Sequence, residues 1–431
     1  MPSNDSQEER TVRNSIFSCL AVVAFVALSG QAFSATVAVG SCTSLVNYAT
    51  IQQAVNASPA GTVIKVCPGN YPEQVAIIAK NLTLEGIKYG TEDAVVILPP
   101  AGGLVANTTD VDSGDPVAAQ LVVQNTGSVS ISNLTVDGTG NGLSCGPDVR
   151  GILFQNSSGT VKHVAVRNQV PNGIPNGCQV GESIWVETAA GHSSTVTIEH
   201  SSVHNYNKNG ITGNDAGTNL TLAGNYIQGA GVVPKPGAAQ NGIQLGFGAT
   251  GTIMDNIVID NIYGDPTVAA SADILLYRAA ENSNITISRN IVGNSQLPIA
   301  LYTDAVGVGD GVSVTGNRVF GASTYDGIDV CTNGNTVTGN TIVNSAESGV
   351  HLDASCGSTG LNNIVTGNVI RESACAGILD DTNGEGGNTI TSDTYFTVPF
   401  TLTNSTSKCN LSAGTAMLAK PKATRKFSPA R

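Results

Sequence analysis

The stretch VTGNTI at residues 337–342 decides the fold, because close copies of it recur along the chain. VTGNRV precedes it at 314–319 and VTGNVI follows it at 365–370. Three looser copies lie further upstream: LAGNYI at 222–227, IMDNIV at 253–258 and ISRNIV at 287–292. The six central asparagines are 31, 34, 27, 23 and 28 residues apart. A short strand cannot bury its apolar side alone, so repeats of this length must stack into a solenoid.

A second motif, usually Gly-aliphatic-x-apolar, recurs once per repeat alongside the first. Its anchors span 226 residues in eight steps, about 28 residues per repeat: Ile152, Ile184, Ile211, Ile243, Ile274, Ile299, Ile328, Val350 and Ile378. We expect these anchors to point inward and to stack coil upon coil. We expect each asparagine to occupy a tight turn, because Asn tolerates the left-handed conformation and its amide can bond to the same group one coil away. Asp393 takes the next position of the asparagine series.

Composition supports a chain built from strands. Charged residues make up 12% and aromatic residues 5%, whereas an average globular chain contains roughly 25% charged residues. Apolar and polar residues alternate, as in the segment TVTI at 195–198, which is the pattern of a strand. Coils of this length suit a parallel β-helix better than a leucine-rich repeat, whose shorter units carry a different leucine pattern. The sequence therefore predicts an all-β fold, a single-stranded parallel β-helix in one solenoid domain.

The two ends of the chain have a different character. Residues 1–34 read as a secretory signal peptide, with Arg13, an apolar run at 16–28 and the small-residue stretch SGQAFSA. That run is shorter than the ~20 residues that cross a bilayer, so we expect no membrane span in the mature chain; an uncleaved anchor is the alternative. We divide the rest into a cap with the first coils at 35–100, repeats at 101–398, and a C-terminal cap with a basic disordered tail at 399–431.

The cysteine count agrees with export. Nine cysteines are present, and removal of Cys19 with the signal peptide leaves eight, an even number that implies disulfides in an exported chain. Equivalent positions one coil apart are about 4.8 Å apart, which is within the range of bridged Cα atoms. A metal site is the alternative, but CxxC spacing is missing. The expected pairs are Cys42–Cys67, Cys145–Cys178, Cys331–Cys356 and Cys375–Cys409.

Residues 48–86 differ from the repeats. Helical spacing from Thr50 to Ala57, terminated by Pro59 and Gly61, predicts a short helix that covers the exposed end of the β-helix, and strands follow at 63–66, 75–78 and 82–84. With its TIQ and AV strings and GNYPE at 69–73, this stretch resembles the opening of pectin methylesterases. The chain as a whole resembles the right-handed parallel β-helix (pectin-lyase-like) superfamily. The resemblance implies the fold and no particular chemistry, because the opening is shared by β-helix proteins of different activity.

The catalytic strings of the enzyme families in this superfamily are missing from the sequence. QDT, DFIFG and GRPW of the esterases are absent, as are GHG and RIK of the polygalacturonases. Residues 325–331, YDGIDVC, are similar to the Tyr-Gly-Phe-Asp-Pro-His motif of mannuronan C5-epimerases. Asp329 keeps the position of the motif's aspartate, but the proline and histidine are replaced. The resemblance alone therefore transfers no catalytic residue.

Side chains that alternate with the anchors should face outward. Along that face, aromatic residues gather in the middle of the series, and carboxylates with one histidine gather towards its end. Enzymes that act on polysaccharides need aromatic rings that stack on sugars beside groups that transfer protons. The segments 137–150, 168–182, 229–241 and 261–272 are long enough to wall a groove. The candidate catalytic residues are Asp329, His351 and Asp353. The candidate substrate-binding residues are Trp185, Glu187, Gln244, Tyr277, Arg278, Tyr302 and Asp381.

Each candidate has a structural alternative. The carboxylates can be ordinary solvated residues beside a hydrogen-bonded histidine, and Trp185 can be an aromatic residue stacked on its neighbours. No cofactor is predicted. Asp304, Asp310 and Asp326 lie near Gly-rich turns and are candidate calcium ligands, although no EF-hand or nonapeptide spacing accompanies them.

Charge limits the choice of partner. The net charge of −12 disfavours nucleic acid, which needs a basic surface, and disfavours a polyanionic glycan. Two functions remain. The first is a secreted, periplasmic or cell-surface protein that binds an extracellular polysaccharide and processes it as a lyase, hydrolase or epimerase, with Asp329 and Asp353 as acid and base and His351 as proton carrier. The second is a non-catalytic adhesion or structural rod.

Overall fold

The computed structural model describes residues 35–404 except 89, 91, 173–177, 235–236, 281–283, 304–309, 356–359 and 383–385. These residues all fall in one compact unit that begins at Ala35. The expected signal peptide and the basic tail lie outside the described residues. Within the described part of the chain, no helix is both long and apolar enough to cross a membrane.

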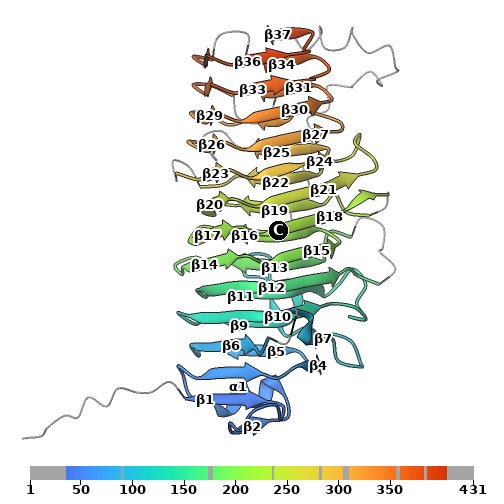
Figure 1. Cartoon of the computed structure of the whole chain (residues 1–431), viewed down its shortest axis with the longest axis vertical. Coiled ribbons are helices and arrows are strands. Elements are labelled where there is room, and N and C mark those ends of the chain that lie inside the picture. The colour runs from blue at the N-terminus through green and yellow to red at the C-terminus, as the bar shows by residue number, and fades with distance from the viewer. Residues whose placement is uncertain are drawn as a thin grey trace, which may run out of the picture. The chain divides into compact units, whose positions relative to one another are not determined.

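Short strands follow one another around each coil and stack on their counterparts in the next coil (Figure 1). Two of the three stacks merge into a 24-stranded sheet, because the long strands β10 and β12 belong to both. The first stack contains β1 (Thr36–Val39), β3 (Val63–Val66), β6 (Leu82–Gly86), β10 (Val129–Asp137), β12 (Gly159–Gln169), β14 (Ser194–Glu199), β17 (Thr218–Ala223), β20 (Thr250–Met254), β23 (Thr286–Ser288), β26 (Ser313–Thr315), β29 (Thr336–Thr338), β32 (Ile364–Thr366) and β35 (Thr389–Thr391).

The second stack of this sheet runs beside the first. Besides β10 and β12 it contains β4 (Gly69–Pro72), β7 (Val95–Leu98), β15 (Ser202–Tyr206), β18 (Tyr226–Val233), β21 (Ile257–Tyr263), β24 (Ile291–Ser295), β27 (Arg318–Ala322), β30 (Thr341–Ser345), β33 (Val369–Arg371) and β36 (Thr394–Phe396). The two-residue strand β2 (Asn47–Tyr48) pairs with β1.

The third stack is a 13-stranded sheet that carries the candidate residues. Its strands are β5 (Val75–Ile78), β8 (Thr108–Thr109), β9 (Pro116–Gln124), β11 (Asp148–Gln155), β13 (Glu182–Glu187), β16 (Asn209–Asn214), β19 (Asn241–Gly246), β22 (Ala272–Tyr277), β25 (Leu297–Tyr302), β28 (Ile328–Val330), β31 (Ser348–Leu352), β34 (Ala376–Asp380) and β37 (Phe400–Thr403). Among the described residues, β8 with β9 is the one antiparallel pairing. The mostly parallel stacks are those of a parallel β-helix.

The predicted stacking of the anchors is confirmed. Ile243 pairs with Ile274 and Ile274 pairs with Ile299, and the same register continues through all nine anchors. All nine are fully buried in one core cluster that extends from Val39 to Ile378. A parallel ladder places equivalent residues of successive coils side by side, so a single apolar interior runs through the stacked coils.

The asparagine series forms the predicted ladder, with one correction. The Asn317 side chain donates to Asn340 Oδ1 at 3.0 Å, and Asn340 donates to Asn368 Oδ1 at 2.9 Å. Asp393 accepts the last of these bonds from Asn368 at 2.9 Å. The expectation that the asparagines themselves are left-handed is wrong, because the positive φ falls on the residue before each, such as Gly316 at +63°. Glycine reaches that conformation without a Cβ penalty, which leaves the asparagine free to point inward.

The helix predicted near the N-terminal end is present as α1 (Ile51–Ala57). Thr50 caps it by accepting a bond from Gln53 N, and Ile51, Ala54 and Val55 are buried. The Gln52 side chain accepts from Ala76 N and donates to Ala76 O, which satisfies backbone groups of the outermost strand β5. One short helix is all that the described residues show in this region, together with the 3-10 turn η1 (Glu92–Ala94). Its role as a cap stays a prediction.

Two of the expected disulfides are present. Cys42 is bonded to Cys67 and Cys145 to Cys178, with Cα–Cα distances of 5.7 and 5.4 Å. Cys331 and Cys375 are also disulfide-bonded. Their expected partners, Cys356 and Cys409, lie outside the described residues, so these two pairings stay predictions.

Candidate functional site

The outer face of the 13-stranded sheet, which points away from the core, carries the candidate side chains in the predicted columns. In the first column Leu153 pairs with Trp185, Gln244 with Leu275, and Asp329 with His351. In the second column Gln155 pairs with Glu187 and Tyr277 with Tyr302. The register that stacks the anchors inside therefore also lines up these residues outside.

Although they take the outer face of the sheet, most members of these columns are buried. Trp185, Asp329, Asp353 and Glu187 are each 1% exposed, and His351 is 4% exposed. Tyr302 and Arg278 are half-buried. Alternation along a strand tells which sheet face a side chain takes, but segments between the strands can cover that face. Small apolar clusters separate from the core lie on it, one around Trp185 and one around Tyr277.

Near the C-terminal end of the sheet, four carboxylates surround one imidazole; we call these five residues the His351 cluster. His351 Nδ1 lies 3.2 Å from Asp326 Oδ2, 3.9 Å from Asp329 Oδ1 and 4.0 Å from Asp353 Oδ2. On the other side of the ring, Nε2 lies 3.4 Å from Asp381 Oδ2. The side chain of Asp381 is 15% exposed, so it lies at the edge of an otherwise buried group. The structure thus brings together the three predicted catalytic residues and Asp381.

Three successive coils supply the members of the cluster. Asp329 lies on β28 and His351 on β31, and the two are direct neighbours in the parallel ladder. Backbone amides fix three of the carboxylates: Ser348 N donates to Asp326, Ser355 N to Asp353 and Ala354 N to Asp381, at 2.9, 2.7 and 2.6 Å. These charge-assisted bonds hold the carboxylates in place.

The carboxylates control the charge of the ring. Burial alone lowers the pKa of a histidine, but the charges of Asp353 and Asp326 outweigh burial and raise the pKa of His351 well above its ordinary value. The carboxylates therefore favour the protonated form of the ring. The cluster has the groups for proton transfer, and two sets of its oxygen and nitrogen atoms are close enough to hold a metal ion: Asp326 with Asp329 and His351, and His351 with Asp353 and Asp381.

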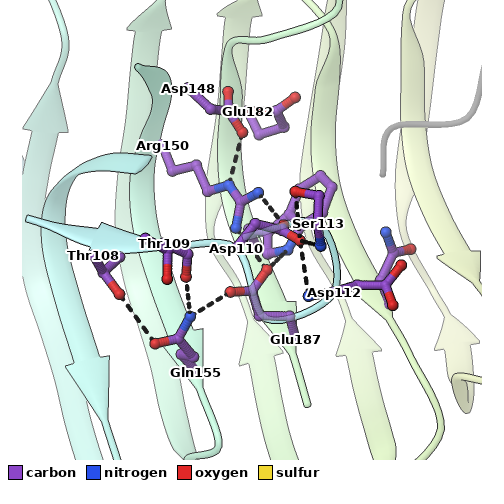
Figure 2. Close-up of polar contacts among 12 residues, drawn as sticks. Thr108, Thr109, Asp110, Asp112, Ser113, Asp148, Arg150, Gln155, Glu182 and Glu187 are labelled. Carbon is purple, nitrogen blue, oxygen red and sulfur yellow. Dashed lines mark hydrogen bonds and ion pairs between the residues drawn. The ribbon is translucent and has the colours of Figure 1, made fainter. Parts of the chain in front are cut away.

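A second polar group lies on the same face, near the N-terminal end of the sheet (Figure 2). Its centre is Arg150, which is 1% exposed and forms ion pairs with Asp110 at 2.7 Å, Asp148 at 2.9 Å and Glu187 at 2.7 Å. The guanidinium also lies 4.1 Å from the centre of the Trp185 ring. We call these five residues the Arg150 network. Because Asp110 follows β8, the network fastens that segment over β11 and β13.

Glu187 and Trp185, predicted to bind substrate, are fully engaged in the network. Trp185 Nε1 donates to Glu187 Oε2 at 2.8 Å, and Gln155 Nε2 donates to Oε1 at 2.6 Å. Burial raises the pKa of Glu187 to about 7, against the charge of Arg150. For Asp110 burial acts in the same direction, but Arg150 outweighs it and lowers the pKa. The pKa values of Asp110 and Glu187 are therefore shifted in opposite directions, although both carboxylates are buried in one network.

The other predicted binding residues lie between the two groups. The Tyr277 and Tyr302 rings stack at 5.7 Å, and Phe247 meets Tyr277 edge-on at 5.3 Å. Arg278 lies 5.6 Å from the centre of the Tyr277 ring. Gln244 is fully buried among the amides of Asn209 and Asn214, to which it is hydrogen-bonded at 3.1 and 3.0 Å.

Sequence reasoning missed Arg150, Asp110 and the place of Asp326 in the His351 cluster. Alternation gave no signal for Arg150, because this residue precedes the inward-pointing anchor Ile152 by two residues and would be placed on the inner face. Asp110 had none, because it reaches the network from a segment 40 residues earlier. Of the three candidate calcium ligands, Asp304 lies outside the described residues, Asp310 belongs to no candidate metal group among the described ones, and Asp326 belongs to the His351 cluster.

Comparisons with known proteins support the fold. The structure is similar to the A-module of mannuronan C-5 epimerase AlgE4 from Azotobacter vinelandii, with a TM-score of 0.52, 15% identity, and 82% of this chain and 92% of that chain covered. It is similar to the GH136 lacto-N-biosidase from Eubacterium ramulus, with a TM-score of 0.58, 10% identity, and 85% and 68% covered. It is also similar to the catalytic domain of a GH87 α-1,3-glucanase in complex with nigerose, with a TM-score of 0.51, 14% identity, and 86% of this chain and 68% of that chain covered.

No protein-family profile matches the sequence, and no curated protein matches it. The structural likenesses, at these identities, concern the fold alone. Together with the stacked parallel sheets, they show that the chain has the parallel β-helix fold that the sequence predicts.

Proposed function

We propose that this is an exported protein that binds an extracellular polysaccharide along the outer face of the 13-stranded sheet and processes it at the His351 cluster. One observation carries the proposal. Aromatic rings and proton-transfer groups lie on consecutive strands of the same sheet face, since Ala300 of β25, two residues before Tyr302, pairs with Asp329 of β28. Sugar platforms beside paired carboxylates are what glycoside chemistry requires.

Further support comes from the fold and from the cysteines. The names of the three similar structures are those of an epimerase of mannuronan, a lacto-N-biosidase and a glucanase. The two disulfides favour an oxidising compartment outside the cytosol.

In this proposal the half-buried Tyr302 and Arg278 contact the sugar. Asp381, at the exposed edge of the His351 cluster, meets the substrate first. In the simplest, metal-free form, Asp329 and Asp353 are the acid and base and His351 carries the proton between them. Trp185, Glu187 and Gln244 are left out of the binding surface, because their polar atoms are buried and bonded to other side chains.

Turnover of neutral and uronic glycans by the purified mature protein tests the proposal. We expect products from the wild type, none from a double variant Asp329→Asn/Asp353→Asn, and wild-type turnover from Asp255→Asn, which changes an exposed carboxylate elsewhere. Tyr302→Ala should weaken glycan binding about fivefold, corresponding to about 1 kcal/mol of lost ring contact. The matched control is Tyr226→Ala, because Tyr226 is 38% exposed and belongs to the other sheet.

The non-catalytic rod remains the second candidate, and the burial of the cluster favours it. Asp326, Asp329 and Asp353 are each at most 1% exposed. Glycan retention by the wild type with no product from any glycan would support this second function and contradict processing at the His351 cluster.

A further inference from the structure

The His351 cluster is built like a metal centre. The imidazole nitrogen Nδ1 faces oxygens of Asp326, Asp329 and Asp353, which come from two neighbouring strands and the segments beside them. Each of the candidate ligand sets has its atoms within 4.8 Å of one another. The side chains of Asp326, Asp329, His351 and Asp353 are each at least nine-tenths buried, so water does not compete freely for the same space.

The distances fit a common ion. Two ligand atoms that are each about 2.1 Å from a metal lie about 3.0 Å apart when they subtend a right angle at the metal, about 3.4 Å apart at the tetrahedral angle, and about 4.2 Å apart on opposite sides of it. The distances from Nδ1 to the three carboxylate oxygens, 3.2, 3.9 and 4.0 Å, all fall in this interval. An ion could therefore be placed between the ligand atoms of Asp326, Asp329 and His351, which all lie within 4.8 Å of one another, with Asp353 beside them at 4.0 Å from Nδ1.

The opposite side of the ring provides an independent feature of metal sites. A histidine that ligates a metal through one nitrogen usually gives its other N–H to a carboxylate, which fixes the tautomer and the ring orientation. Asp381 is in that position, 3.4 Å from Nε2. Asp381 is itself held by the backbone amide of Ala354 at 2.6 Å, so the ring is supported from outside the ligand set.

Charge points the same way. Four carboxylates face the ring, and bringing negative charges together in a buried site is costly. A divalent ion held by Nδ1 and three of the carboxylates would offset part of this charge. Calcium and magnesium prefer ligand sets made of oxygen alone, whereas a mixed set of one imidazole and three carboxylates suits a transition metal.

We propose that the His351 cluster binds one divalent transition-metal ion, of the zinc or manganese type, with Asp326, Asp329, His351 and Asp353 as ligands and Asp381 as the residue that orients the ring. Metal binding stands on its own. Its chemical consequence rests on the proposed function: Asp329 and Asp353 act as ligands, and a water bound to the ion replaces them as the proton acceptor.

Metal binding is measured on the mature chain after treatment with a chelator and dialysis. Titration with Zn²⁺ and with Mn²⁺, followed by calorimetry and by elemental analysis of the dialysed protein, should give one equivalent per chain. His351→Gln should remove this equivalent. Asp381→Asn should weaken the affinity about 10- to 100-fold. Asp255→Asn, on an exposed ion pair, should bind like the wild type.

A second measurement covers variants that fail to fold. Heat unfolding of the wild-type protein should shift upward with Zn²⁺ or Mn²⁺ and not with Ca²⁺ at the same concentration, because a ligand that binds only the folded state stabilises it. A wild type that binds neither ion and shows no such shift would overturn the proposal, and so would a folded His351→Gln variant that keeps the full equivalent.

The two proposals fail separately. One equivalent of metal without turnover of any glycan leaves the metal site standing and contradicts processing. Turnover that persists in chelator-treated protein free of metal contradicts the catalytic role of a metal-bound water and leaves the proposed function standing, whereas the absence of any bound equivalent contradicts the metal site itself.

Discussion

Replacement of Arg150 by methionine tests whether the Arg150 network stabilises the N-terminal part of the 13-stranded sheet. The change keeps most of the aliphatic stem and removes the guanidinium, so Asp110, Asp148 and Glu187 lose their shared partner. Removal of one member of a buried ion pair typically costs 3–5 kcal/mol. Glu187 keeps two hydrogen bonds and has a pKa of about 7, so it can become neutral. We therefore expect the lower part of that range, about 3 kcal/mol, at pH 7.

The assay is denaturant unfolding followed by far-UV circular dichroism, with midpoint and slope fitted separately. The control is Arg289→Met, because Arg289 pairs with Asp255 at 2.6 Å but is 59% exposed; its midpoint should hardly move. The loss in Arg150→Met should shrink towards pH 4, where the orphaned carboxylates take up protons. Equal midpoints for the two variants at pH 7 would refute the reasoning.

Three further outcomes follow from the structure. Because the pKa of Glu187 is raised from 4.5 to about 7, the folded state holds an extra proton between these two pH values, and the unfolding free energy contributed by this group should fall as pH rises between them. Glu187→Gln should therefore flatten the dependence of unfolding free energy on pH, and an unchanged pH dependence in the variant contradicts this. Asn317→Ala removes a 1% exposed amide that donates to Ile287 O and to the next ladder amide, and should lower the unfolding free energy by about 3 kcal/mol in denaturant titration; a loss below about 0.5 kcal/mol would contradict a supporting role for the ladder. Gly349→Ala places a Cβ 2.4 Å from Ile370 Cγ2 and 2.8 Å from a backbone oxygen and should lower the melting temperature, whereas Gly102→Ala meets nothing within 4 Å and should not; equal melting temperatures would disprove the steric argument.

The sequence was sufficient for the register and insufficient for exposure. All nine anchors stack as predicted, because a period of two residues within the strand and a constant coil order leave one arrangement that buries every anchor. The same alternation placed Trp185 and His351 on the outer face correctly. It gave no information about coverage: Asp110, which closes over Arg150, comes from a segment 40 residues earlier with no repeat signature of its own.

For the His351 cluster, too, the register was predictable from the sequence and the burial was not. Asp329 and His351 are ladder neighbours, which stacking alone implies. Asp326 was missed as a member because it precedes the strand, where no periodic rule applies. The conformation of the asparagines was predicted wrongly because the left-handed residue of a turn and the residue whose amide bonds across coils are adjacent, and composition does not tell them apart.

Because ladder spacings differ between 23 and 34 residues while the ladder itself stays continuous, the coil is the natural unit by which this molecule can grow or shrink. Excision of residues 317–339 would join Gly316 to Asn340. This junction keeps the Gly-Asn turn and shortens the β-helix by one coil. The length could thus be changed by whole coils, because the coils brought together would meet through the same turn and anchor positions. Extra residues in any coil would extend outward between the strands, where they alter the surface and leave the interior unchanged.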